Sequence, residues 1–136
     1  MTDRARYDDG LEVRRAVLGD AWVDKSLAAR TPLDSAFQDL ITRYAWGEVW
    51  TRPGLSHDTR RLLVLAMTIA LNREHEFRLH LRAALDSGMT AETIEEVLLQ
   101  SAIYCGVPAA LTAFNWAKDV IAQRDAATNS EREPSK

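Results

Sequence analysis

The stretch Ser56–Leu71, SHDTRRLLVLAMTIAL, decides the fold. Ser56 belongs to the residue types that cap helix N-termini, and Asp58 would lie in the first turn, where the helix dipole favours a carboxylate. The last ten residues, 62–71, are apolar on every side of a helix rather than along one stripe. Such a helix needs apolar neighbours all around it. We therefore expect it to lie at the centre of a helical protein or to be covered by another subunit.

Helical spacing recurs on both sides of this stretch, and no run of alternating β-branched residues indicates a strand. A helix is predicted from Ala5 to Leu18, with Gly19 as its stop. After a turn at residues 31–34, Asp34 or Ser35 caps a helix with apolar residues at helical spacing, namely Phe37, Leu40, Ile41 and Tyr44. Further helices are predicted over about 74–87, 90–105 and 108–123, between breaks at 52–55, 88 and 106–108, and Thr90 is expected to cap the second of these. The sequence thus predicts an all-α, single-domain bundle of about six helices.

The C-terminal residues differ in character from the rest of the chain. Residues 125–136 are polar and lack apolar periodicity. We expect the domain to cover residues 1–124 and residues 125–136 to form a disordered tail.

The composition is that of an ordinary globular protein without a basic surface. Of 136 residues 27% are charged, with a net charge of −3, which disfavours nucleic acid and anionic membranes as partners. Cys105 is the only cysteine, so the chain has no internal disulfide and no CxxC motif. The N-terminus lacks the apolar core of a signal peptide, and a ten-residue apolar run is too short to span a bilayer. A cytoplasmic protein is predicted.

The segment Asn72–His80, NREHEFRLH, holds the residues best suited to acid–base chemistry. On a helix, Glu76 and His80 lie on one face, beside an apolar stripe that begins at Phe77. A carboxylate next to an imidazole near buried surface can act as an acid–base pair, and it would favour a cationic His80 near neutral pH. The alternative is a solvated ion pair on an ordinary amphipathic helix, which the spacing alone favours.

Arginines near helix ends and turns are the second signal, because a guanidinium can hold a ligand carboxylate in a bidentate fork. They are Arg14, Arg15, Arg43, Arg52, Arg60 and Arg61. Most are expected to face solvent, Arg60 and Arg61 above all, whereas Arg52 precedes a rigid Pro-Gly turn. Trp46 and Trp50, one turn apart, could wall a pocket or could be core residues.

No metal site is predicted. His75 and His80 are five residues apart, which is poor spacing for joint ligation, and no third ligand follows at a recognisable offset. Cys105 follows Tyr104 at a helix end without an obvious base nearby. An inert thiol is the better interpretation, and a reactive nucleophile is the alternative.

Several longer strings of the sequence are more specific than any of these single residues. The most specific are Trp46-Gly-Glu-Val-Trp-Thr-Arg-Pro-Gly-Leu55 and Gln100-Ser-Ala-Ile-Tyr-Cys-Gly-Val-Pro108. The strings Arg6-Tyr-Asp-Asp-Gly10, Val13-Arg-Arg-Ala-Val-Leu-Gly-Asp20 and Glu76-Phe-Arg-Leu-His-Leu-Arg-Ala-Ala84 add to them. Together these strings resemble the γ-carboxymuconolactone decarboxylases, and the resemblance extends from Ala5 to about Asp119, which is nearly the whole chain.

The resemblance implies the all-helical, alkylhydroperoxidase-D-like fold and a homo-oligomer, expected to be a hexamer. It also implies decarboxylation of γ-carboxymuconolactone to β-ketoadipate enol-lactone, in the protocatechuate branch of the β-ketoadipate pathway. We expect no cofactor, because the unsaturated lactone can itself accept the electrons that carbon dioxide leaves behind. The small-molecule partner would therefore be a dicarboxylate lactone.

For this reaction we expect Glu76 and His80 to be catalytic, with His80 stabilising the anion and delivering the proton. Arg15 and Arg52 are expected to hold substrate carboxylate. Trp46 and Tyr104 are expected to line the substrate site.

Two other classes of function stay open. Peroxide reductases of the same superfamily use a Cys-x-x-Cys pair followed by a histidine, and here Glu76 stands in place of the second cysteine while His80 matches the histidine. A peroxide reductase would therefore have to combine Cys105 with an external thiol. A non-catalytic helical oligomer or small-molecule binding module would show the same amphipathic helices.

Overall fold

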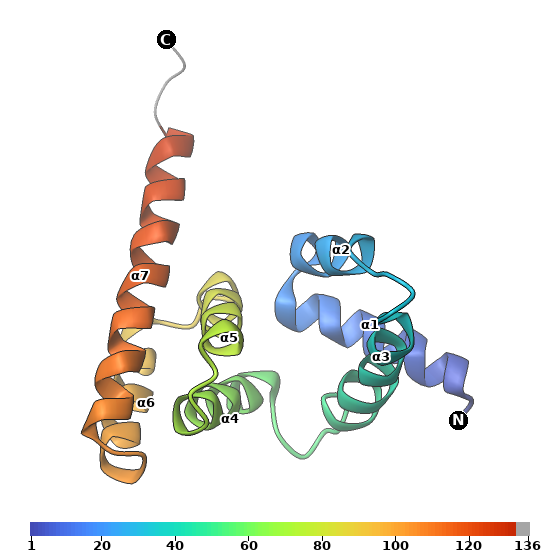
Figure 1. Ribbon diagram of the computed structural model, residues 1–136, viewed down its shortest axis with the longest axis horizontal. Coiled ribbons are helices and arrows are strands. Elements are labelled where there is room, and N and C mark those ends of the chain that lie inside the picture. Colours follow the sequence, from blue (N-terminus) through green and yellow to red (C-terminus); the bar gives the residue numbers. More distant parts are fainter. Residues whose placement is uncertain (133–136) are drawn as a thin grey trace. The chain divides into compact units, whose positions relative to one another are not determined.

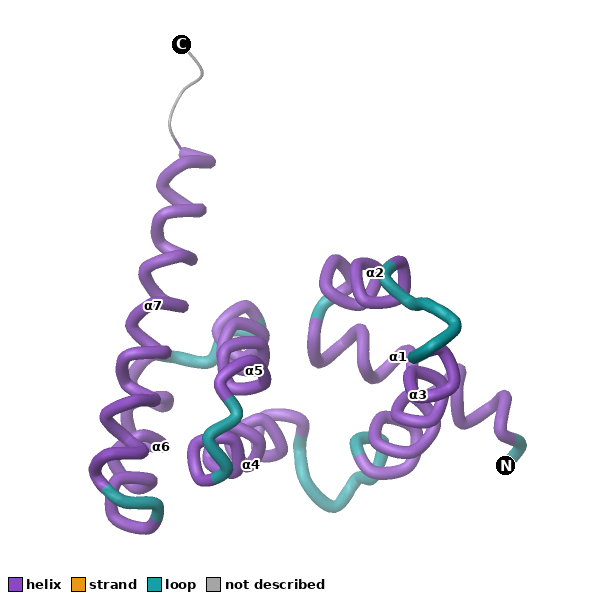
Figure 2. The backbone as a smooth tube through the Cα atoms, viewed as in Figure 1, coloured by secondary structure: helices purple, strands orange, loops and turns teal. Residues whose placement is uncertain are grey.

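A computed structural model describes residues 1–132 (Figure 1). These residues form seven α-helices and one π-helix and contain no strand (Figure 2), which confirms the predicted all-α class. The chain divides into two compact units, Met1–Arg60 and Arg61–Lys136, and each is described by itself. No helix among residues 1–132 combines the length and apolar character that crossing a membrane requires.

The first unit opens with two helices that meet at a glycine. Helix α1, Asp3–Leu18, starts at Thr2, whose hydroxyl accepts a hydrogen bond from the amide of Ala5 at 3.0 Å. It ends at Gly19, as predicted, and the φ of +90° there suits glycine. Helix α2, Asp20–Ala28, begins at once and was not predicted. A single glycine therefore ends one helix and lets the next start in a new direction.

Two further helices complete the first unit, α3 at Ser35–Ile41 and the π-helix η1 at Thr42–Val49. The amide of Trp50 donates to the carbonyl of Ala45 at 3.0 Å, which is the five-residue step of a π-helix. This wider winding breaks the spacing that the sequence suggested. Phe37, Leu40 and Tyr44 are more than half exposed in the chain, so the predicted apolar stripe does not form a buried face of the unit.

Helices α1 and η1 cross in direct backbone contact. A Cβ atom on Gly10 would overlap the carbonyl oxygen of Thr42 and lie 2.8 Å from the amide nitrogen of Gly47. A Cβ atom on Gly47 would in turn press on the carbonyl oxygen of Arg6. Only glycine at both positions allows this approach, which packs η1 directly against α1.

The second unit contains the rest of the helices. Helix α4, His57–Ala70, begins before the division at Arg61, and α5, Glu74–Asp86, α6, Ala91–Tyr104, and α7, Val107–Arg132, follow it. Ser56 and Thr90 accept amide hydrogen bonds at the starts of α4 and α6, as predicted. The core joins all four helices through Leu65, Ile69, Phe77, Leu81, Leu85, Ile94, Leu98, Ala113, Trp116, Ala117 and Val120.

Helix α4 is not surrounded by protein within the chain. It buries Arg61, Leu65, Thr68 and Ile69 along one face. On another face Leu63, Met67 and, just past the helix, Leu71 are 40%, 57% and 65% exposed. Of the two expectations for the apolar stretch, the central position is therefore wrong, and cover by another subunit stays a prediction.

Helix α7 extends well past the core. Figure 1 shows α5 and α6 beside its N-terminal part, where contacts to α5 continue as far as Arg124, while the last turns carry on without them. Residues 125–131 are exposed on every side and helical, so the predicted disordered tail is wrong as far as Arg132. Ala126, Ala127 and Glu131 are good helix formers, and lack of apolar periodicity excludes packing rather than helix. Residues 133–136 lie outside the described residues.

Candidate active site

His80 lies on the inner side of α5 in the second unit. It follows buried Phe77 by three residues and precedes buried Ala84 by four, so the stripe predicted beside it is confirmed as core. The residue is half-buried, and its Nδ1 atom is withdrawn from solvent. Burial lowers the pKa of His80 from 6.5 to about 4; the nearby Arg61 guanidinium also lowers it, whereas the Glu76 carboxylate raises it.

The structure corrects the expected charge of His80. With a pKa of about 4, the imidazole of His80 is in its neutral form at pH 7. The sequence argument considered Glu76 alone, which does act in the expected direction. Loss of hydration and a second cation outweigh it, so the imidazole is neutral.

Glu76 shares helix α5 with His80 but is exposed. It lies in the first turn of the helix, where the dipole favours a carboxylate whatever its function. Because the half-buried His80 is not in bulk water, the interpretation of the pair as a fully solvated surface ion pair does not hold. The two residues form an asymmetric pair, with a water-facing carboxylate and an imidazole turned to the core.

Arg61 is the residue that the sequence argument missed. It was expected to face solvent, but only 3% of it is exposed. Arg61 shares the buried face of α4 with Leu65, Thr68 and Ile69, at steps of four and three residues. That spacing was present in the sequence, but a stretch apolar on every side gave no reason to prefer one face. The structure thus brings a buried guanidinium into the electrostatic environment of His80.

Helix α5 is held firmly on α7, which gives His80 a rigid support. Arg78 bonds to Glu74 on its own helix and to Asp119 on α7, both at 3.1 Å. Arg82 donates to Gln123 at 2.6 Å, and Arg124 bonds to Asp86 at 3.0 Å. The rings of Phe77 and Trp116 pack 5.5 Å apart between the same helices. A side chain on such an element has a defined position.

Trp46 and Trp50 form a tilted pair of rings inside the first unit. Their ring centroids are 4.9 Å apart, and 7% and 9% of the residues are exposed. His57 packs edge-on against Trp50 at 6.1 Å. Arg52 is exposed, and its carbonyl accepts a hydrogen bond from Arg60 at 3.3 Å. The tryptophans are core residues of the unit, which was one of the two interpretations left open.

The neighbouring arginines Arg14 and Arg15 have opposite environments. Arg15 bonds to Asp20 at 3.2 Å and to Asp24 at 2.8 Å, and hydrogen bonds to Asp24 and Asp20 raise its pKa. Arg14 is 4% exposed and donates to Ser26 at 3.2 Å. The sequence favoured Arg15 for a substrate carboxylate, yet Arg15 already has two carboxylates as partners.

Tyr104 and Cys105 lie at the end of α6. Tyr104 is 84% exposed, and Cys105 is a half-buried free thiol at the C-cap. Within residues 1–132 no three histidine, cysteine or acidic side chains gather as they would around a metal ion.

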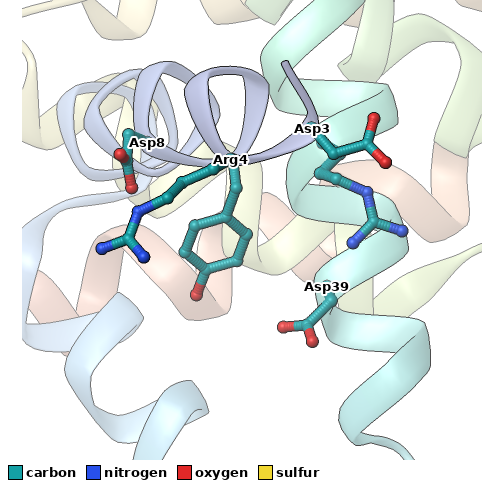
Figure 3. Close-up of a pocket in the computed structure, with 6 residues that line it drawn as sticks. Asp3, Arg4, Asp8 and Asp39 are labelled. Atoms are coloured by element: carbon teal, nitrogen blue, oxygen red, sulfur yellow. The ribbon is translucent and has the colours of Figure 1, made fainter.

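Two surface pockets lie in the first unit, and both are lined by Arg43, one of the candidate arginines, but by none of the residues assigned to the catalytic or substrate site. The larger, of about 360 Å³, is formed by Asp3, Arg4, Tyr7, Asp8, Asp39 and Arg43. Figure 3 shows Arg4 and Asp8 on the same helix, with Asp39 on a separate helix. The smaller, of about 160 Å³, shares Asp3 and Arg43 with it. Three carboxylates face two guanidinium groups in the larger pocket, which does not favour an anionic ligand.

The fold and the site together define a class, the small all-α proteins that place a neutral imidazole beside a buried guanidinium on rigid helices. Such a site can stabilise an anion and move a proton. Residues 35–119 match the carboxymuconolactone decarboxylase family, and the chain belongs to this family.

Similar proteins include named decarboxylases. The chain is 45% identical over 120 residues to 4-carboxymuconolactone decarboxylase of Acinetobacter baylyi, covering 88% of this chain and 90% of the relative. It is 42% identical over 110 residues to nitrosuccinic acid decarboxylase of Metarhizium robertsii, covering 81% of this chain and 77% of the relative. A 48-residue sequence of 4-carboxymuconolactone decarboxylase from Pseudomonas putida is 50% identical over its whole length, which corresponds to 35% of this chain.

Proposed function

We propose that the chain decarboxylates 4-carboxymuconolactone (γ-carboxymuconolactone) to β-ketoadipate enol-lactone without an added cofactor. The observation that carries this proposal is the 45% identity to a 4-carboxymuconolactone decarboxylase along 88% of the chain. Membership of the family and the charge arrangement around His80 support it. The predicted cytoplasmic location belongs to the same proposal, and cell fractionation tests it.

The substrate can supply its own electron sink. The departing carboxylate is attached to a ring carbon next to a carbon–carbon double bond, and this double bond is conjugated with the lactone carbonyl. When the carbon–carbon bond breaks, carbon dioxide leaves and the electron pair moves to the carbonyl oxygen, which gives a dienolate. A proton then adds to the carbon next to the carbonyl. The protein has to stabilise the oxyanion and provide that proton.

Arg61 and His80 can share these two tasks. Arg61 is the permanent cation beside His80, so it can stabilise the dienolate while His80 is neutral. A bound dicarboxylate brings negative charge toward the pair, which offsets Arg61 and raises the pKa of His80 in the complex. The imidazole can then take a proton from solvent, pass it to the dienolate carbon, and return to its neutral form.

The other predicted residues fit this proposal to different degrees. Exposed Glu76 raises the pKa of His80 and so favours proton uptake. Arg52 is exposed and can bind a carboxylate, whereas Arg15 would have to give up Asp20 or Asp24 to do so. Buried Trp46 would act by shaping the substrate site, and Tyr104 would have to reach the substrate from an exposed helix end.

The decisive experiment is direct. Purified, metal-stripped protein is mixed with 4-carboxymuconolactone, and carbon dioxide release and the ultraviolet absorbance of the lactone are followed without added cofactor. We expect catalytic release in the wild type and a loss of turnover in H80A that exceeds its loss of substrate binding. Folded wild-type protein that leaves the lactone unchanged would refute the proposed reaction.

A second substrate deserves the same assay, because the chain is 42% identical to a nitrosuccinic acid decarboxylase. Nitrosuccinic acid is also a dicarboxylic acid that carries its own electron sink, since a nitro group can accept the electron pair left by carbon dioxide. The two candidate substrates are compared by their kcat/KM values, and we expect the lactone to have the higher value.

We also propose that the protein acts as a homo-oligomer, with a hexamer as the expected form. The apolar residues Leu63, Met67 and Leu71 form an exposed stripe at steps of four residues. Leu99, Ile103, Val107 and Leu111 are similarly exposed around the corner between α6 and α7. Extended apolar surface of this kind is typical of a protein interface. Light scattering coupled to size-exclusion chromatography measures the mass.

A further inference from the structure

Arg14 is a buried cation without an acidic partner. Only 4% of the residue is exposed, and its guanidinium donates one hydrogen bond, from Nη2 to Ser26 on α2. The Nε and Nη1 atoms are buried and have no acceptor among residues 1–132. Buried N–H groups nearly always have an acceptor, and buried charges nearly always have a counter-ion. Arg14 therefore stands out from the ordinary pattern of folded proteins.

The first unit does not lack carboxylates to pair with arginine. Arg15, the next residue, bonds to Asp20 and Asp24, and Arg6 bonds to Asp3 and Glu48. The acidic residues of α2 thus face Arg15, while the uncharged Ser26 of the same helix faces Arg14. Nε and Nη1 lie on different edges of the guanidinium, and each shares its edge with Nη2, which has two N–H groups and gives one to Ser26. One complete edge therefore stays open, and two parallel N–H donors on one edge are the arrangement that a planar carboxylate recognises.

We propose that Arg14, rather than Arg15, binds a carboxylate of the small dicarboxylate substrate, so that the ligand supplies the missing counter-ion. The inference rests on the proposed function for the class of ligand. Arg15 then has a structural role and ties α2 to α1 through Asp20 and Asp24. Burial lowers the pKa of Arg14 and the nearby Tyr7 raises it, and a bound carboxylate would add to the effect of Tyr7.

Helix α2 is the neighbour of Arg14 that can move most easily. It contributes the Ser26 hydroxyl that Arg14 contacts, and among its nine residues only Val23 is buried. It joins α1 through Gly19 at a φ of +90°. A helix with so little buried surface can move at a smaller cost than a core helix. In our proposal a small displacement of α2 admits the carboxylate to the open edge of the Arg14 guanidinium.

Two adjacent arginines provide a matched pair of variants, R14Q and R15Q. We would measure the thermal midpoint of each with and without succinate, a stable dicarboxylate, using sodium chloride at equal ionic strength as the control. Succinate should raise the midpoint of the wild type and of R15Q, and should have no effect on R14Q. With 4-carboxymuconolactone, R14Q should raise KM roughly tenfold or more and change kcat less, while R15Q should leave KM near its wild-type value.

A purely structural Arg14 gives a different result. R14Q would then lose stability but keep the succinate response and KM, and that outcome overturns the proposal. If R14Q does not fold, R14K keeps the charge without the fork and should show the same rise in KM. The Nε resonance of Arg14 in unaltered protein should also shift with succinate, and an unchanged resonance overturns the proposal. These binding measurements stay decisive even if the wild type releases no carbon dioxide, so the two failures are distinguishable.

Discussion

At the scale of single residues, His80 should make the stability of the protein depend on pH. Its pKa is about 4 in the folded chain and near 6.5 in the unfolded chain, so the unfolded state binds more protons between these values. Stability should therefore fall as the pH is lowered through this window, by about 3 kcal/mol for this one group. In H80Q the position stays neutral, and urea unfolding at pH 6.5 and pH 4 should show a correspondingly smaller loss.

His75 offers the matched control for this experiment. It lies on the same helix but is exposed, so H75Q should keep the pH dependence of the wild type. If H80Q and H75Q lose the same free energy of unfolding between the two pH values, the depressed pKa of His80 is contradicted.

Arg61 should act both on His80 and on turnover. In R61Q the pKa of His80 should rise, because one of the two influences that lower it is removed, and proton NMR of the imidazole measures this. Turnover should fall about 100-fold if Arg61 stabilises the oxyanion. R61K retains the charge and should keep the pKa low. A pKa of His80 that is the same in R61Q and the wild type would show that the guanidinium exerts no effect.

The contrast between these two residues shows what sequence can supply at this scale. The relation of Glu76 to His80 is local, because four residues along one helix set it, and it could be predicted. The neutral state of His80 depends on burial and on Arg61, which belongs to another helix. Neither burial nor a neighbour from a distant segment can be obtained from local spacing, so the predicted charge was wrong.

At the scale of helices, the crossing of α1 and η1 should tolerate no side chain. G10A would force a methyl group into the backbone of Thr42 and Gly47, and G47A would do the same at Arg6. Each substitution should lower the free energy of unfolding by about 3 kcal/mol or more, which is the upper end of the range for overpacked cores, because the clash is with backbone atoms. Chemical denaturation measures it.

Gly54 is the control for the crossing, since an added Cβ meets nothing within 4 Å there and its φ is not in the left-handed region. G54A should therefore be close to neutral. Equal stability of G10A and G54A would mean that the two helices are not in backbone contact.

Helix boundaries were predictable where a cap or breaker marks them. Gly19, Ser56 and Thr90 lie at helix ends as expected. The hydroxyls of Ser56 and Thr90 accept an amide hydrogen bond from the first turn, and Gly19 adopts the backbone conformation that ends a helix. The π-helix was not predictable, since a change from four-residue to five-residue hydrogen bonding has no marker residue. Helix α2 was missed because its nine residues bury only Val23 and show little periodicity.

At the scale of the whole molecule, assembly should depend on the exposed stripe of Leu63, Met67 and Leu71. M67E places a charge at its middle residue, so we expect the wild type to run as an oligomer and M67E to run at a lower mass by light scattering. N129D makes the same change in charge on the exposed end of α7 and should leave the mass unchanged. A wild type that has the mass of one chain at every concentration would contradict the proposed oligomer.

The end of α7, residues 125–131, is helix without neighbours, since these residues are exposed on every side. A short solvated helix has only its own propensity to hold it, so its amide hydrogens should exchange with deuterium far sooner than those beside Trp116 and Val120. This segment is consequently the natural place to attach a dye or a surface anchor. A probe attached there would stay bound to the protein without disturbing its core.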